Sequence, residues 1–136
     1  GWKMFLSNLR LHLIHFAGQN ATVSLPGAHV SGPADAAWVD FCAALGIPAD
    51  ADVGDRVDVS ASDAPALGGV VGDRTQTRIS LVVDDPCPGT ALIAAEQMGD
   101  SVGLSVWSYL YGADGRTVVE RDEPLWQSWL EATAGS

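Results

Sequence analysis

His12 and His15 are the residues whose spacing most resembles a metal site. They lie three positions apart, so on a helix both imidazoles would project from one face, as paired ligands in helical bundles do. A structural or catalytic site needs a further ligand of known position, and the sequence offers none. We therefore expect no metal and no cofactor, and we interpret both histidines as surface or helix-interface residues. His29 is expected to lie exposed in a loop.

A second group of candidate ligands is the acidic stretch from Asp50 to Asp58, which also holds Asp52 and Asp55. Carboxylates at this spacing suggest calcium. The EF-hand pattern fails, because it needs glycine at the sixth position and a carboxylate at the twelfth, where this chain has Asp55 and Ala61. We interpret the stretch as a solvated acidic edge.

Catalytic motifs are scarce. Glu96 could serve as a general base if it pointed into a cavity, although an exposed strand end is the plainer interpretation. The glycines of residues 68–72 have the wrong spacing for a dinucleotide fingerprint and indicate a bulge or close packing on a sheet. Lys3 is the only lysine, which excludes a phosphate-loop lysine and a Ser-x-x-Lys pair. We predict no catalytic residue.

Charge narrows the choice of partners. The 136 residues carry a net charge of −10, divided between +2 for residues 1–34 and −12 for residues 35–136. Neutralising phosphates takes a basic surface that the body lacks, so nucleic acid is not an expected partner. An anionic membrane is disfavoured for the same reason. Two cysteines, Cys42 and Cys87, make no disulfide framework and suit a cytoplasmic location.

The elements that would position a site follow from periodicity. Apolar residues at steps of three and four predict an amphipathic helix over residues 2–17, stopped by Gly18, and a second helix over residues 34–45, stopped by Gly46. Asp122 is the expected N-cap of a closing helix, with Pro124 in its first turn. Strands joined by short turns, which favour an antiparallel meander, are predicted over residues 21–25, 53–59, 67–71, 77–83, 90–96 and 102–111.

The last predicted strand is apolar on both faces. Val102, Leu104 and Val106 point one way, whereas Trp107 and Tyr109 point the other. An antiparallel strand with one wet face alternates with polar residues, so both faces of this strand are expected to be covered. The best candidate for a ligand-binding surface is the aromatic set that this strand shares with the helices, and ordinary core packing is its alternative: Trp38, Trp107, Tyr109, Tyr111, Trp126 and Trp129.

Several packing and turn motifs resemble those of a known superfamily. They are Gly1-Trp2 with Phe5-Leu6-x-Asn8-Leu9, Ala37-Trp38 with Ala44-Leu45-Gly46, Asp85-Pro86-Cys87-Pro88-Gly89-Thr90-Ala91, and Asp122-Glu123-Pro124-x-Trp126-x-x-Trp129-Leu130. Together with the element order, they resemble the SRPBCC (START and birch-pollen-allergen-like) superfamily, in its bacterial branch related to the activator of the heat-shock chaperone ATPase. The resemblance implies an α+β helix-grip fold, in which a curved antiparallel sheet wraps around a long C-terminal helix.

The same resemblance implies a hydrophobic cavity between the sheet and the closing helix, in which members of the superfamily bind lipids and other apolar ligands. We therefore predict a non-catalytic domain that binds a small apolar ligand. The sequence leaves open whether the cavity is open or filled. Residues expected to line it are Trp38, Phe41, Leu81, Val83, Ile93, Trp107, Tyr109, Leu125 and Trp129.

Two alternatives belong to other functional classes. One is a protein-interaction or co-chaperone-like assembly module with a filled core, and the other is a cyclase-like or hydrolase-like enzyme that uses Glu96, Tyr109 or Tyr111. Residues 2–6 and 126–130 share the pattern Trp-x-x-aromatic-Leu, which suggests an internal repeat. We therefore expect residues 1–18 to be the closing helix of an absent or swapped preceding copy, residues 21–136 to form the domain, and residues 1–17 to be able to mediate a homodimer.

Overall fold

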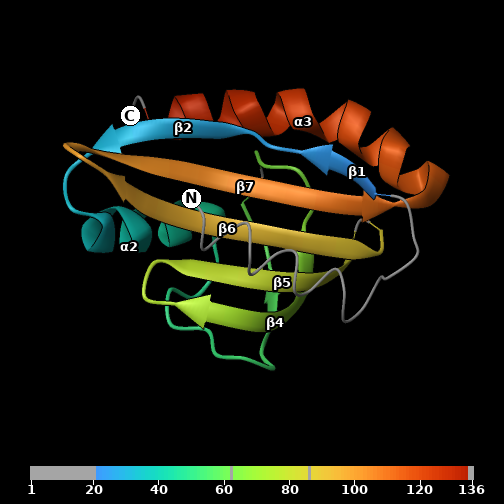
Figure 1. Cartoon of the computed structure of the whole chain (residues 1–136), viewed down its shortest axis with the longest axis horizontal. Helices are drawn as coiled ribbons and strands as arrows, with labels where there is room; N and C mark the ends of the chain where they lie inside the picture. The colour runs from blue at the N-terminus through green and yellow to red at the C-terminus, as the bar shows by residue number, and fades with distance from the viewer. Residues whose placement is uncertain (1–20, 62, 86, 135–136) are drawn as a thin grey trace.

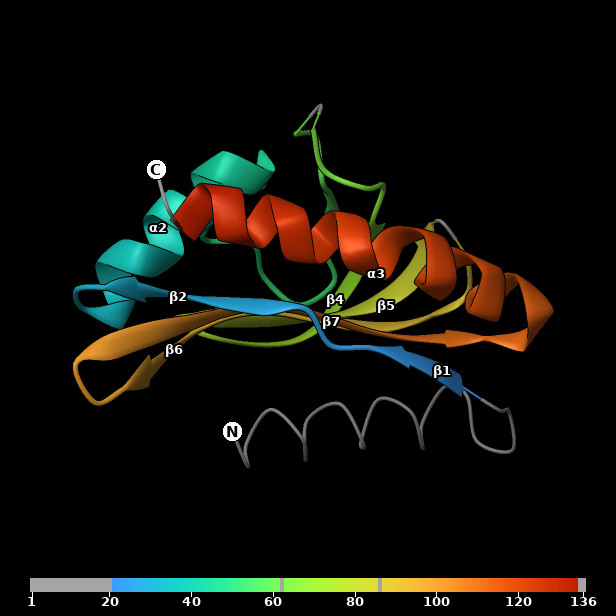
Figure 2. The same ribbon diagram turned by 90° about the horizontal axis from the view of Figure 1, so that it is seen from above.

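The computed structural model describes residues 21–61, 63–85 and 87–134. The predicted helix 2–17, His12 and His15 lie outside these described residues. An antiparallel sheet of seven strands forms one layer, and the helices α2 (Ala34–Leu45) and α3 (Gly112–Ala134) form a second layer on one face of it (Figures 1 and 2). We call the face toward the helices the inner face and the opposite one the outer face. The predicted helix-grip architecture of class α+β is confirmed.

Five strands form the predicted meander. The strand order in the sheet is β1-β7-β6-β5-β4-β3, and each neighbouring pair is antiparallel. Gly99, with a φ of 65°, makes the turn between the two longest strands. The strands of the meander are β3 (Arg56–Asp58), β4 (Gly68–Thr75), β5 (Arg78–Asp85), β6 (Gly89–Met98) and β7 (Ser101–Tyr111).

The edge beside β7 is made of two short strands in succession. β1 (Ala21–Ser24) pairs with the second half of β7, and β2 (Gly27–Ser31) pairs with the first half. Between them the Gln127 side chain of α3 bridges to the backbone of Gly27, accepting its N–H at 3.0 Å and donating to its carbonyl at 2.8 Å. The edge is thereby tied to the closing helix.

Alternation along the strands divides the buried residues between the two faces. Val102, Leu104 and Val106 of β7 join the large inner core with α2 and α3, as predicted. On the outer face, Leu92 and Ala94 form a separate buried cluster against which Trp107 packs. The predicted orientation of the two sides of β7 is therefore confirmed.

The prediction that the glycines of residues 68–72 mark a bulge or close packing on the sheet is confirmed. The register of β4 against β5 shifts between Gly68 and Gly69, which marks a bulge. A Cβ atom at Gly69 would lie 2.1 Å from the carbonyl oxygen of Val82, so the two backbones approach more closely than any side chain allows.

Four predictions about local structure were wrong. Residues 27–31 form β2, so His29 lies in a strand, although it is exposed as expected. Strand β3 covers only three of the seven residues predicted for it. Helix α3 begins at Gly112, so Asp122 is not its N-cap and Pro124 lies in its interior instead of its first turn.

No helix among the described residues is long and apolar enough to cross a membrane.

Candidate functional site

The space between the inner face and α3 is filled by side chains. Trp129 of α3 packs edge-on against Trp126 at a centroid distance of 5.7 Å and lies 6.2 Å from Phe41 of α2. The space left beneath the middle of α3, next to Ser24, Ser108 and Trp126, has a volume of about 10 Å³. A volume of that size holds on the order of one water molecule. Among the described residues, the space beneath the middle of α3 is therefore too small for an organic ligand.

A groove opens at one end of the grip, between α2 and the C-terminal end of α3. Figure 2 shows these two helix segments side by side above the sheet. The volume of the groove is about 450 Å³. Strands β2 and β7 line it with Val30 and Leu104, and the last turn of α3 lines it with Thr133 and Ala134. We call this space the α2–α3 groove.

Helix α2 forms the wall of the groove because of its residue spacing. Ala37, Phe41 and Ala44 recur at intervals of four and three, which places them on one side of the helix. Two of the three are alanines, so this side of the helix leaves space beside the single large ring of Phe41. The groove therefore forms where small residues of α2 lie beside the last turn of α3.

Three polar side chains line the groove. Asp40 of α2 contributes a carboxylate, and Ser31 and Thr133 contribute hydroxyls. The exposed lining of the groove is about equally polar and apolar, so it offers both an apolar contact surface and hydrogen-bonding groups. The arrangement can hold an apolar body and hydrogen-bond one polar end of it.

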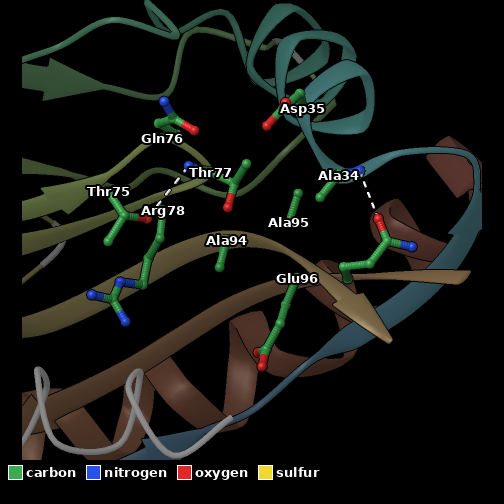
Figure 3. Close-up of a pocket in the computed structure, with 10 residues that line it drawn as sticks. Ala34, Asp35, Thr75, Gln76, Thr77, Arg78, Ala94, Ala95 and Glu96 are labelled. Carbon is green, nitrogen blue, oxygen red and sulfur yellow. Dashed lines mark hydrogen bonds between the residues drawn. The ribbon is translucent and has the colours of Figure 1, made fainter. Parts of the chain in front are cut away.

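A second pocket, of about 420 Å³, lies where the β4–β5 turn meets the start of α2 (Figure 3). Gln97 closes one side by accepting a hydrogen bond of 2.9 Å from the backbone N–H of Ala34. Asp35 and Glu96 project on opposite sides of β6, so their carboxylates do not converge. A pair of acids acting on one substrate needs convergence, so this geometry does not assemble an acid–base pair from them.

The tyrosines named for an enzymatic alternative lie on the outer face, away from the groove. Tyr109 and Tyr111 alternate with Ser108 and Leu110, which face the helices. Burial, with a smaller contribution from Tyr109, raises the pKa of the Tyr111 phenol above its ordinary range. Tyr111 therefore stays protonated at neutral pH and is not poised as a general base.

The structure does not gather the nine residues predicted for the ligand site into one place. Phe41 lines the α2–α3 groove, while Leu81, Val83 and Ile93 are buried in the core on the inner face of β5 and β6. Trp107 and Tyr109 lie on the outer face. Leu125 is 53% exposed on α3.

Trp38 and Trp129 are buried and anchored by their indole nitrogens. Trp38 donates a hydrogen bond of 3.0 Å to the carbonyl of Ala49, and Trp129 donates one of 3.0 Å to Asp63. A buried indole whose N–H group is hydrogen-bonded is held in one orientation and packs as part of the core. Neither residue lines the groove, and their part in ligand binding stays a prediction.

Comparisons with known proteins identify the fold and no more. No family model and no curated protein matches the sequence. Protein MLL2253 from Mesorhizobium loti has a similar structure, with a TM-score of 0.59, 15% sequence identity, and coverage of 82% of this chain and 96% of that one. Protein CV1439 from Chromobacterium violaceum matches with a TM-score of 0.53, 18% identity, and coverage of 82% and 96%.

A third similar structure is DynU16, described as a putative protein in the dynemicin biosynthetic locus. Its TM-score is 0.62 at 14% identity, over 83% of this chain. This chain spans 46% of DynU16, so the matched fold is about half of that longer protein. At these identities the likeness establishes a sheet gripped against a C-terminal helix, which the three proteins share with this one.

Proposed function

We propose that this chain is a non-catalytic helix-grip domain of the SRPBCC type that binds a small hydrophobic ligand in the α2–α3 groove. The groove is the observation that carries the proposal, because its volume of about 450 Å³ has room for a small molecule and its lining includes the apolar residues Val30, Phe41 and Leu104. The shared fold supports the superfamily assignment, and the small-molecule pocket range of about 300–1,000 Å³ supports a ligand of modest size.

Charge further defines the proposed ligand. Asp40 is the charged side chain among the groove residues, and the whole chain carries −10. A ligand carboxylate would be repelled by both, since like charges in a partly desolvated groove oppose binding. We therefore propose a neutral or cationic apolar ligand, such as a sterol or a polyphenol, in preference to a fatty acid.

A matched pair of alanines on α2 provides the test. Ala43 and Ala44 are adjacent and both exposed, but only Ala44 lines the groove. Ala44→Phe would fill the groove, whereas Ala43→Phe adds the same ring to the outside of the helix. Sterols, polyphenols and fatty acids are screened by ligand-induced shifts in melting temperature, and the Kd of each hit is measured by isothermal titration calorimetry.

The expected result is that Ala44→Phe weakens binding at least about tenfold while Ala43→Phe binds like the parent. Equal binding by the parent and both variants would place the ligand elsewhere and overturn the proposed site. A screen in which only fatty acids bind would overturn the charge argument.

A second candidate function is an assembly or co-chaperone-like module. One observation favours it, namely that the space beneath the middle of α3 holds only about 10 Å³. The screen above separates the two candidates, because such a module needs no small-molecule ligand and would give no shift with any compound.

We also propose a cytoplasmic location. Its support is chemical, since Cys42 and Cys87 are both free thiols and both buried. Free thiols are typical of proteins kept in reducing compartments.

A further inference from the structure

The outer face of the sheet carries a stripe of fully buried residues. Leu92 and Thr90 of β6 are 0% exposed, and Ser80 of β5 is also 0% exposed. Both described helices lie on the inner face (Figure 2), so neither of them covers this stripe. A leucine in the middle of an uncovered sheet face keeps its tip in water, so the burial of Leu92 requires a cover.

The stripe has the width of one helix. On the outer face, Ser80, Thr90 and Leu92 are fully buried and Val82 of β5 is half-buried, whereas Val70 of β4 and Val23 of β1 are each 40% exposed. The covered region therefore extends over the neighbouring strands β5, β6 and β7 and ends before β4 and β1. Two strand spacings are about 10 Å, which is about the diameter of an α-helix with its side chains.

We propose that residues 2–17 of the same chain form the cover, as an amphipathic helix packed on the outer face. The segment lies outside the described residues, and its apolar residues recur at the helical spacing. They are Trp2, Phe5, Leu6, Leu9, Leu13 and Phe16.

Chain length and connection favour an intramolecular contact. A helix of sixteen residues is about 24 Å long, which fits along strands as long as β6 and β7. The segment is joined to Ala21, the first residue of β1, which pairs directly with Tyr111 of β7. It therefore reaches the outer face of β7 through only three intervening residues, 18–20.

Charge also favours this occupant. The segment holds Lys3 and Arg10 and no acidic residue, whereas residues 35–136 carry a net charge of −12. On the outer face, Glu96 of β6 lies beside the buried stripe, and Asp73 of β4 forms an ion pair of 3.9 Å with Arg78 of β5. Opposite charges attract across an interface and guide its docking, so a basic segment suits this surface. The inference does not depend on a ligand in the α2–α3 groove.

Photo-crosslinking in the full chain tests the placement directly. Trp107 is half-buried and packs against Leu92, so p-benzoylphenylalanine in its place would sample whatever covers the stripe. The matched control carries the same group in place of Leu125, which is 53% exposed on α3. Crosslinks are mapped by mass spectrometry after mixing isotopically labelled and unlabelled protein.

The expected result is a crosslink from position 107 to residues 2–17 of the same molecule, and none to that segment from position 125. A crosslink between labelled and unlabelled molecules would overturn the intramolecular placement in favour of a swapped dimer. Crosslinks from position 107 only to residues outside the segment would overturn the proposal altogether.

A double-mutant cycle gives an independent measurement. Leu92 and Ile93 are adjacent on β6, both 0% exposed, and point to opposite faces. If the segment covers the outer face, Leu9→Ala couples with Leu92→Ala by about threefold or more in the unfolding equilibrium constant, and adds independently to Ile93→Ala. Independent effects in both pairs, or coupling with Ile93 alone, would contradict the proposal.

Discussion

The indole Nε1 of Trp129 donates a hydrogen bond of 3.0 Å to Oδ1 of Asp63, across 66 residues of sequence. Asp63 lies in the loop between β3 and β4, and Trp129 is buried near the C-terminal end of α3. The bond therefore fastens the closing helix to the loop beside it. It also satisfies the one polar atom of a side chain that otherwise packs against Phe41 and Trp126.

Removing the acceptor should cost measurable stability. Asp63→Ala leaves the indole N–H without its partner at a partly buried site, and we expect a loss of about 1 kcal/mol in the free energy of unfolding. Asp63→Asn keeps an oxygen acceptor and should cost much less. Urea denaturation of the parent and both variants measures the difference. Equal losses for Ala and Asn would show that the carboxylate acts through its charge.

Gly69→Ala should be far more damaging than another glycine substitution in the same sheet. A Cβ at Gly69 would lie 2.1 Å from the carbonyl oxygen of Val82 and 2.8 Å from its carbonyl carbon, and backbone atoms cannot move aside cheaply. At Gly103 the nearest atom is the sulfur of Met98 at 2.9 Å, at the end of a flexible side chain.

We expect Gly69→Ala to cost at least about 2 kcal/mol and Gly103→Ala less than about 1 kcal/mol. Thermal unfolding followed by circular dichroism measures both. A melting temperature for Gly69→Ala within a degree of the parent would contradict the close approach of β4 and β5.

Periodicity predicted most of the fold because most elements have one clear buried side. Helix α2 matched its predicted bounds, since Trp38, Phe41 and Leu45 recur at helical spacing and Gly46 adopts a φ of 75° that ends the helix. Strand β2 was missed because it lies at the sheet edge, follows Pro26, and none of its residues is fully buried. An edge strand of this kind shows no alternation to detect.

The start of α3 was missed for a different reason. Gly112, Ala113, Asp114 and Gly115 have the composition of a turn, yet they form the first turn of the helix. Gly115 is needed there because a Cβ would lie 2.6 Å from the carbonyl carbon of Leu110. This glycine allows the helix to pack closely against the end of β7. In the sequence alone, a glycine needed for close packing looks the same as a glycine needed for a turn.

The candidate site was harder to predict than the fold. Of its residues, only Phe41 belonged to the predicted ligand set. Sequence patterns draw attention to large apolar residues, but large residues fill space and close the centre of the grip. The groove opens where Ala36, Ala37 and Ala44 leave room, and it combines elements from both ends of the chain. Small residues in an apolar helical pattern were the available signal.

Arg56 binds the carboxylates of Asp58 and Asp84 and should lower the pKa of Asp84. Arg56 donates to Asp84 at 2.8 Å and to Asp58 at 3.0 Å, and the hydrogen bond from Arg56 holds the pKa of Asp84 below its usual range. Arg56→Gln should therefore raise the pKa of Asp84, as measured by carboxyl-detected NMR titration.

The sign of the associated stability follows from that lowered pKa. Asp84 contributes stability above the unfolded pKa, near about pH 4, and loses it as the pH falls through the lower folded value. The pair is exposed to solvent, so the contribution is small and salt should reduce it. An unchanged Asp84 titration in Arg56→Gln would contradict the interaction.

The Cys42 thiol should be unreactive in the folded protein. Its ionisation in the unfolded chain should lower the stability of the fold at high pH. Burial against the inner core raises the pKa of its thiol to about 12, with Arg74 opposing the shift weakly. The thiolate is the reactive form, so in a Cys87→Ser background, which leaves Cys42 as the only thiol, a thiol reagent at pH 8 should modify the unfolded chain and spare the folded one.

Because the folded pKa of Cys42 exceeds the unfolded value of about 8.5, the unfolded chain loses its proton first as the pH rises. The stability that Cys42 contributes is therefore fully present below about pH 8.5 and declines as the pH rises toward 12. Urea denaturation between pH 7 and 10.5 should show a steeper fall for the parent than for Cys42→Ala, which has no thiol to ionise. Parallel curves for the two proteins would mean that Cys42 titrates normally in the fold, as it would if water reached the space between α2 and the sheet.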